Sequence, residues 1–220
     1  MVHSPVVPAI IPRDAADITS FLAKLPGLHE IHVDVVDGHF VPMISWPYAP
    51  LGVPSTLYEQ FDPYTLEVDL MVATPLEAAR AWVAAGADML VFHVETISVE
   101  AVVAFAASHK ITVGVAASSD TPDEVLWAYV PHVDYVQVMG IEAIGQQGQP
   151  FDIRALERIH RLKNAFPSLL ISIDGSMNDS TIVQAREAGA DRYIVGSVIY
   201  KAPDPFNAFL QLTNLVSSTD

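Results

Sequence analysis

Strand-like apolar segments alternate with amphipathic segments from one end of the chain to the other. The apolar segments predict eight strands, because strands are short runs bounded by turn signals. They lie near Val6–Ile11, Glu30–Val35, Thr65–Val72, Met89–Val94, Thr112–Ala116, Tyr135–Met139, Leu169–Asp174 and Arg192–Val195. The segments between them predict helices near Ala15–Lys24, Pro75–Ala85, Val99–Ser108, Asp123–Tyr129, Ile153–Phe166, Ser180–Ala188 and Pro205–Val216. The poorly patterned stretch Pro47–Glu59 would have to supply the helix after the second strand.

Local signals support these boundaries. Thr74-Pro75 and Thr121-Pro122 place a cap-type residue before proline, which is the favoured start of a helix. Gly-Ala-Asp occurs at 86–88 and again at 189–191, and each copy is expected to end a helix with glycine in the left-handed conformation.

The alternation predicts an α/β protein with the (β/α)8 TIM-barrel fold and a single domain over residues 1–220. A doubly wound open sheet is the competing architecture. It is disfavoured because no G-x-G-x-x-G follows the first strand and because the strand count closes at eight.

Composition narrows the possible functions. The apolar runs are too short for a membrane span, and Met1–Pro5 does not resemble a secretory signal. Cysteine is absent, which excludes disulfides, thiolate nucleophiles and Cys-ligated zinc and is compatible with the expected cytoplasmic location. A net charge of −15 with only 11 basic residues argues against a nucleic-acid partner. A phosphate group would have to be held by backbone N–H groups and helix ends.

Polar side chains occur where several apolar strands end. His32 and Asp34 are two residues apart on the second strand, so they point to the same side. Alone, this pair is more often a buried ion pair than a reactive site. The third strand adds Asp69, the fourth His93 and the seventh Asp174, and in a barrel these strand ends meet at the mouth.

The histidine and the acidic residues at these strand ends together predict a site for one divalent metal ion rather than a metal-free acidic cluster. The expected ligands are His32, Asp34, Asp69 and Asp174. One nitrogen and three carboxylates suit Mn²⁺, Fe²⁺ or Mg²⁺ and do not exclude Zn²⁺. His93 would orient a neighbouring acid or line the pocket, and a purely structural role is equally compatible with its position.

Small residues follow the last three strands. They are Gly145–Pro150, including Gly148 and Gln149, then Asp174-Gly175-Ser176 and finally Gly196-Ser197. Each segment alone is an ordinary turn. Together, after strands six, seven and eight, they predict a site for a phosphorylated small-molecule substrate.

Taken in order, the motifs resemble the ribulose-phosphate 3-epimerase family from about Val6 to Pro205. They are His-Val-Asp-Val-Val-Asp-Gly-His-Phe-Val-Pro, Asp-Leu-Met-Val, Phe-His-Val-Glu, Val-Met, Gly-Gln-Pro-Phe, Ile-Asp-Gly-Ser and Ile-Val-Gly-Ser. The resemblance implies a metal-dependent isomerase that inverts C3 of a ketopentose 5-phosphate, with metal ligands at His32, Asp34 and Asp174. It also implies that Asp34 and Asp174 are the acid/base pair, that Met71 and Met139 cover the intermediate, and that the chain forms a homo-oligomer.

The expected chemistry agrees with these residue types. Removing a proton next to a ketone needs a base and a group that stabilises the enediolate, which a metal would provide. Inversion needs a proton taken from one face and another delivered to the opposite face, hence two carboxylates. Methionine is apolar and would exclude water from the planar intermediate. For Met71 and Met139 considered alone, core packing is the simpler interpretation.

Several positions depart from the family pattern. Asp69 stands where the family has a histidine ligand, Ala9 follows Pro8 where the family has a serine, and Ser176 replaces a glycine. The loop after the sixth strand is one residue longer and carries Glu142, which would repel a phosphate unless it turns away.

The expected activity is conversion of D-ribulose 5-phosphate to D-xylulose 5-phosphate in the pentose phosphate pathway. Epimerisation of a related ketose phosphate such as allulose 6-phosphate is the nearest alternative. Barrel decarboxylases and aldolases of the hexulose-phosphate type use a lysine beside the strand-three acid, which Glu67-Val68-Asp69-Leu70 lacks. A catalytically silent paralogue that binds a sugar phosphate or a protein partner is the alternative outside the enzymes.

Overall fold

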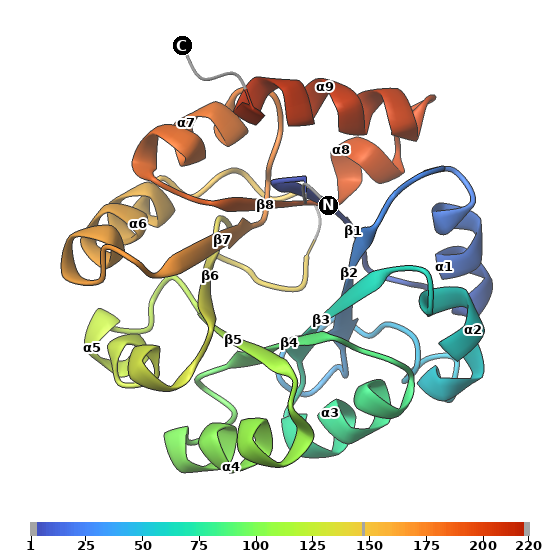
Figure 1. Cartoon of the computed structure of the whole chain (residues 1–220), viewed down its shortest axis with the longest axis horizontal. Helices are drawn as coiled ribbons and strands as arrows, with labels where there is room; N and C mark the ends of the chain where they lie inside the picture. Colours follow the sequence, from blue (N-terminus) through green and yellow to red (C-terminus); the bar gives the residue numbers. More distant parts are fainter. Residues whose placement is uncertain (1–3, 147, 218–220) are drawn as a thin grey trace.

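Eight parallel strands close into a barrel in the order of the sequence, and β8 pairs with β1 to complete it (Figure 1). The computed structural model describes residues 4–146 and 148–217. The strands are β1 Val6–Ile10, β2 Glu30–Val36, β3 Thr65–Met71, β4 Met89–His93, β5 Thr112–Ala117, β6 Tyr135–Met139, β7 Leu170–Asp174 and β8 Arg192–Val195. The predicted (β/α)8 barrel is confirmed, with every strand at its expected place.

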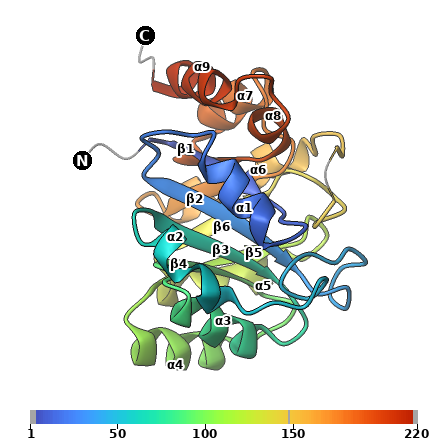
Figure 2. The same ribbon diagram turned by 90° about the vertical axis from the view of Figure 1, so that its right-hand side faces the viewer.

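Helices surround the barrel on its outer side (Figures 1 and 2). They are α1 Ala15–Leu22, α2 Tyr58–Phe61, α3 Pro75–Ala84, α4 Val99–His109, α5 Asp123–Trp127, α6 Arg154–Ala165, α7 Thr181–Ala188, α8 Ser197–Tyr200 and α9 Pro205–Ser217, with 3-10 turns η1 Pro54–Leu57 and η2 Val130–His132. The helix after β2 is thus only one turn, preceded by η1. In the described residues, no helix is both long enough and apolar enough to cross a membrane.

The helix boundaries refine the expected signals. Pro75 occupies the first turn of α3 as predicted, whereas α5 begins one residue later than Pro122, so Thr121 is not its capping residue. Gly86 and Gly189 both have positive φ angles, 96° and 103°; Gly86 lies two residues beyond the end of α3, and Gly189 directly follows α7. The aspartate that follows in each Gly-Ala-Asp copy accepts a hydrogen bond from the backbone of the preceding strand, Asp88 from Leu66 and Asp191 from Ile171. The repeated tripeptide therefore ends a helix and fixes the entry of the next strand.

The main apolar core lies between the strands and the helices. Outward-facing strand residues such as Val33, Val35 and Leu70 are fully buried there with helix residues such as Ile18 and Trp82. The inside of the barrel differs from the usual packing of branched apolar side chains. Its fully buried members include polar groups from five strands: His32, Glu67, Asp69, His93, Gln137 and Ser172.

Candidate active site

His32 and Asp34 enter the barrel side by side from β2, as the two-residue period of a strand requires. His32 is fully buried and Asp34 is 7% exposed. The Nε2 atom of His32 lies 3.2 Å from Oδ1 of Asp34, and its Nδ1 atom lies 2.9 Å from Oε2 of Glu67. The imidazole therefore lies between a carboxylate near the mouth and a second one deeper in the barrel.

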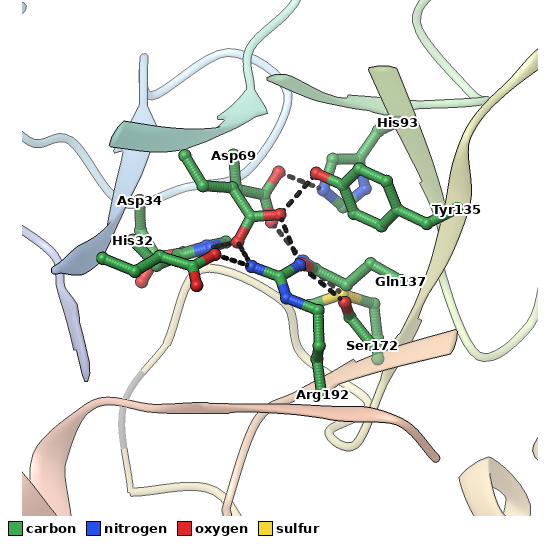
Figure 3. Close-up of polar contacts among 11 residues, drawn as sticks. His32, Asp34, Asp69, His93, Tyr135, Gln137, Ser172 and Arg192 are labelled. Atoms are coloured by element: carbon green, nitrogen blue, oxygen red, sulfur yellow. Dashed lines mark hydrogen bonds and ion pairs between the residues drawn. The ribbon is translucent and has the colours of Figure 1, made fainter. Parts of the chain in front are cut away.

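Asp69 lies beside Asp34 because β2 and β3 pair in a register that matches these two residues. Each of its carboxylate oxygens has a partner: Oδ1 is 3.0 Å from Nε2 of His93, and Oδ2 accepts a 2.8 Å hydrogen bond from Nε2 of Gln137. His93 thus contacts a neighbouring acid, which is one of the roles expected of it. These two contacts fix the orientation of the Asp69 carboxylate (Figure 3).

Three of the four predicted ligands form a group that fits a divalent cation. One donor atom each from His32, Asp34 and Asp69 lie within 4.8 Å of one another, and all three residues are buried. One imidazole nitrogen and two carboxylate oxygens are suitable ligands for the first-row divalent metals and for Zn²⁺. Asp174 is not a member of this close group, although it lines the same cavity as Asp34.

The crowding of acids shifts their ionisation. Burial raises the pKa of Asp174 well above its usual value, and the charge of Asp34 raises it further. Burial also raises the pKa of Asp34, against the opposing effect of His32. Burial alone would lower the pKa of His32, but the charge of Glu67 and the hydrogen bond to Asp34 raise it overall. A divalent cation at this position would favour the deprotonated carboxylates and the neutral imidazole.

A cavity of about 310 Å³ opens above this group and brings both candidate acid/base aspartates together. In the closed barrel, β2 and β7 are separated by β8 and β1 on one side, so Asp34 and Asp174 reach the cavity from different parts of its wall. No lysine or arginine of the described residues lines it. The predicted residues that line it are Asp34, Met71, Gly148, Gln149, Asp174, Gly175, Ser176, Gly196 and Ser197.

Met139 is the predicted substrate contact that does not line this cavity. It packs with Met71 in a buried cluster that also contains Val36 and Tyr135, and its sulfur accepts a 3.7 Å hydrogen bond from Gln137. Of the two expected methionines, the structure therefore brings only Met71 to the cavity wall.

The contacts of two further polar residues near the mouth, Asp37 and Glu142, show what their side chains do. Asp37 accepts hydrogen bonds from the backbone N–H groups of His39, Phe40 and Ala73, so it fixes the turn after β2 and ties it to the end of β3. The Glu142 side chain is 73% exposed, lies 3.9 Å from Arg154 and is absent from the cavity wall. Glu142 thus turns away from the site. Gln147, in the predicted loop Gly145–Pro150, lies outside the described residues.

The sequence interpretation missed a set of polar residues in the same interior: Glu67, Tyr135, Gln137, Ser172 and Arg192. Glu67 precedes Asp69 by two residues, and Ser172 precedes Asp174 by two, so each shares the inward face of its strand. Applying the two-residue period backwards from the predicted ligands would have found both.

Comparison with known proteins identifies the family of this chain. The model of the ribulose-phosphate 3 epimerase family matches residues 2–200. The chain belongs to this family. It is 33% identical over 216 residues to the ribulose-phosphate 3-epimerase of Mycobacterium bovis, covering 94% of this chain and 90% of that one. The Chlamydia muridarum ribulose-phosphate 3-epimerase is 31% identical, with 89% and 88% covered.

Family membership confirms the resemblance and the expected isomerase class. Among solved structures, a 3-hexulose-6-phosphate synthase from Salmonella typhimurium superimposes with a TM-score of 0.73, covering 96% of this chain and 97% of the other. Its sequence identity to this chain is 15%, so this likeness concerns the barrel fold alone.

Proposed function

We propose that this member of the ribulose-phosphate 3-epimerase family is a metal-dependent epimerase that interconverts D-ribulose 5-phosphate and D-xylulose 5-phosphate. The observation that carries the proposal is that Asp34 and Asp174 line one cavity with His32 and Asp69 gathered beside them. A base and an acid that reach one bound sugar from different strands are what inversion at a single carbon requires.

In this proposal, one aspartate removes the C3 proton and the other protonates the opposite face of the planar intermediate. In either direction of the reaction, one of the two aspartates acts as the base and the other as the acid, and the roles reverse for the opposite direction. The cation, held by His32, Asp34, Asp69 and Asp174, would supply electrostatic stabilisation for the negative charge that develops on the substrate oxygens. Met71 would cover the flat intermediate and exclude water.

The phosphate group would bind where the loops after β6, β7 and β8 line the cavity. Gly148, Gln149, Gly175, Ser176, Gly196 and Ser197 all contribute to that wall. Because the wall has no lysine or arginine among the described residues, backbone N–H groups and hydroxyls would have to bind the anion. The outward turn of Glu142 removes a repulsive charge from this region. A homo-oligomer, as expected from the family resemblance, remains part of the proposal.

The direct test is an assay of D-ribulose 5-phosphate conversion with Asp34→Asn and Asp174→Asn. General acid–base catalysis contributes roughly 10²–10⁴-fold, so each variant should lose that much activity. Asp120→Asn is the matched control, because the Asp120 side chain is 75% exposed, pairs with Arg154 and does not line the cavity. Conversion that is unchanged in both site variants would refute the two-aspartate mechanism.

Proton exchange with deuterated water sharpens this test. A variant that keeps one functional aspartate should still exchange the C3 proton of one epimer without converting it to the other. The aspartate that remains decides which epimer exchanges. Allulose 6-phosphate should be assayed in parallel, since faster conversion of that sugar would reassign the substrate. Absence of turnover with both sugars in metal-loaded protein would favour the silent paralogue.

A further inference from the structure

A second polar layer lies deeper in the barrel, toward the start of the strands, and the proposed mechanism does not use it. We call it the lower polar layer: Glu30, Glu67, Tyr135, Ser172 and Arg192. Arg192 and Glu30 are the first residues of β8 and β2, and Glu67 pairs in register with His32. Burying a charged side chain at this depth costs folding free energy unless the charge is paired, so the partners of each charged group matter.

The Glu67 carboxylate is held at both oxygens. Its Oε2 atom lies 2.9 Å from Nδ1 of His32 and accepts a 3.1 Å hydrogen bond from Arg192. Its Oε1 atom accepts from Arg192 at 3.1 Å and from the hydroxyl of Tyr135. The guanidinium thus binds Glu67 in the bidentate manner, which fixes both the position and the plane of the carboxylate.

Arg192 is itself anchored on two further sides. It donates a 3.0 Å hydrogen bond to the Ser172 hydroxyl and forms an ion pair with Glu30, and its guanidinium lies 5.6 Å from the centre of the Tyr135 ring. Its side chain is 12% exposed. Figure 3 shows the Arg192 side chain extending into the barrel beside Ser172, with dashed lines to its partners. The contacts therefore run in series from Arg192 through Glu67 to His32.

This series decides which nitrogen of His32 faces the candidate cation site. With Nδ1 donating to Glu67, Nε2 is directed toward Asp34, 3.2 Å away, and belongs to the group of donors that fits a cation. A carboxylate behind a histidine orients the ring and makes it a better metal ligand. Without Arg192, Glu67 and Glu30 would be left without their shared cation.

We infer that Arg192 is a positioning residue for the cation site: through Glu67 it holds His32 with Nε2 directed at Asp34 and Asp69. The inference rests on the proposed function, because the cation site is part of it. It assigns to Arg192 and Glu67 a role that a merely structural ion pair would not have.

The test measures metal affinity of purified, metal-free protein by competition with a chelator, using Mn²⁺ and Zn²⁺. The variants are Arg192→Met, Glu67→Gln and the double variant, with Arg192→Lys as the conservative replacement. Lys163→Met is the matched control, since Lys163 pairs with Asp191, next to Arg192, at 2.7 Å on the outside of the barrel. Circular dichroism and urea unfolding report whether each variant folds.

Arg192→Met and Glu67→Gln should each weaken metal binding roughly 10–100-fold, the usual effect of removing a group behind a ligand. Since the two act in series, the double variant should bind no more weakly than the worse single variant. Arg192→Lys should recover part of the affinity, and Lys163→Met should bind as the wild type does. In nitrogen NMR spectra of the zinc-loaded protein, the Nδ1–H signal of His32 should be present in the wild type and shifted or lost in Glu67→Gln.

The outcomes separate the two proposals. If the wild type binds neither metal, the proposed function is overturned, and this inference with it. If the wild type binds metal and folded Arg192→Met binds it equally well, only the inference is overturned. Should Arg192→Met fail to fold, Glu67→Gln decides the matter: wild-type affinity together with an unchanged His32 signal would overturn the inference.

Discussion

The ring of Tyr135 on β6 lies directly over Gly114 on the neighbouring strand β5. A Cβ atom at Gly114 would be 2.4 Å from Cζ of Tyr135, far inside van der Waals contact. The missing side chain at Gly114 gives the ring its space, and the ring in turn carries the hydroxyl that donates to Glu67. A glycine on one strand thus makes possible a polar contact with a strand across the barrel.

Gly114→Ala should therefore destabilise the protein and disturb the lower polar layer. We expect a loss of about 1–3 kcal/mol in the free energy of unfolding, as for other overpacked interiors. Urea unfolding would measure it. Gly114→Ala combined with Tyr135→Leu should lose less than the sum of the two single changes, because the clash is then absent. If the two losses in unfolding free energy simply add, the position of the Tyr135 ring does not depend on Gly114.

Asp17 should stabilise the protein in a pH-dependent way. Its carboxylate accepts two hydrogen bonds from the Arg13 side chain, at 2.8 Å and 3.0 Å, and one from the Tyr200 hydroxyl at 2.6 Å. The hydrogen bonds from Arg13 are the main cause that lowers the pKa of Asp17 to about 2. Asp17→Asn should cost about 1–2 kcal/mol of unfolding free energy near neutral pH.

The sign of the pH effect follows from the lowered pKa. The contribution of Asp17 is complete above the pKa of the unfolded chain, about 3.9, and is lost as the pH falls through the folded value. The stability difference between wild type and Asp17→Asn should therefore shrink as the pH is lowered from about 4 toward the folded pKa. Urea unfolding at several pH values measures it, and a difference that does not change with pH would contradict the assignment.

Much of the fold follows from local sequence patterns. The strands were predictable because apolar runs such as Tyr135–Met139 are bounded by clear turn signals. The helix after β2 was not, because 47–59 has no helical period; the structure forms only η1 there and the one-turn α2, which begins at Tyr58 and ends at Phe61. The four-residue α8 is likewise too short to give a periodic signal.

Less of the candidate site than of the fold could be predicted from the sequence. His32 and Asp34 are close in sequence, so a strand's two-residue period sufficed to place them together. The contact between Arg192 and Glu67 joins residues 125 positions apart on strands that are not neighbours. Such a contact depends on the closure and register of the barrel, which no local pattern contains. The same reason applies to Met139: its strand was predicted correctly, but its absence from the cavity lining depends on how the barrel interior packs.

Ser176 should affect substrate binding more than stability. It has a φ angle of 54°, which is strained for a residue other than glycine, and its hydroxyl donates to the Gln149 carbonyl at the cavity wall. Ser176→Gly relieves about 1 kcal/mol of backbone strain and also removes a hydrogen bond of about the same value. The free energy of unfolding of this variant should therefore hardly differ from that of the wild type. Ser176→Ala keeps the strain and should be less stable.

Both variants lose the hydroxyl that ties the loop after β7 to the loop after β6. We therefore expect both to raise KM for the ketose phosphate with a smaller effect on kcat, as for a lost binding contact. Steady-state kinetics of the two variants side by side provide the measurement. Unchanged KM in both would show that the Ser176 hydroxyl has no part in the substrate site.

Asp69 should be a ligand even though it replaces the histidine of the family pattern. Addition of a divalent metal to metal-free wild type should raise the free energy of unfolding by about 2.7 kcal/mol when free metal is 100 times its Kd. Asp69→Asn keeps the size of the side chain but removes a charge from the donor group. The increase in its free energy of unfolding on adding metal should therefore be smaller. Thermal and urea unfolding with Mn²⁺, Zn²⁺ and Mg²⁺, each against a chelator-treated sample, would measure the gain. Asp120→Asn should gain as much as the wild type. An equal gain in Asp69→Asn would remove Asp69 from the donor set and leave His32 and Asp34 to hold the cation with Asp174.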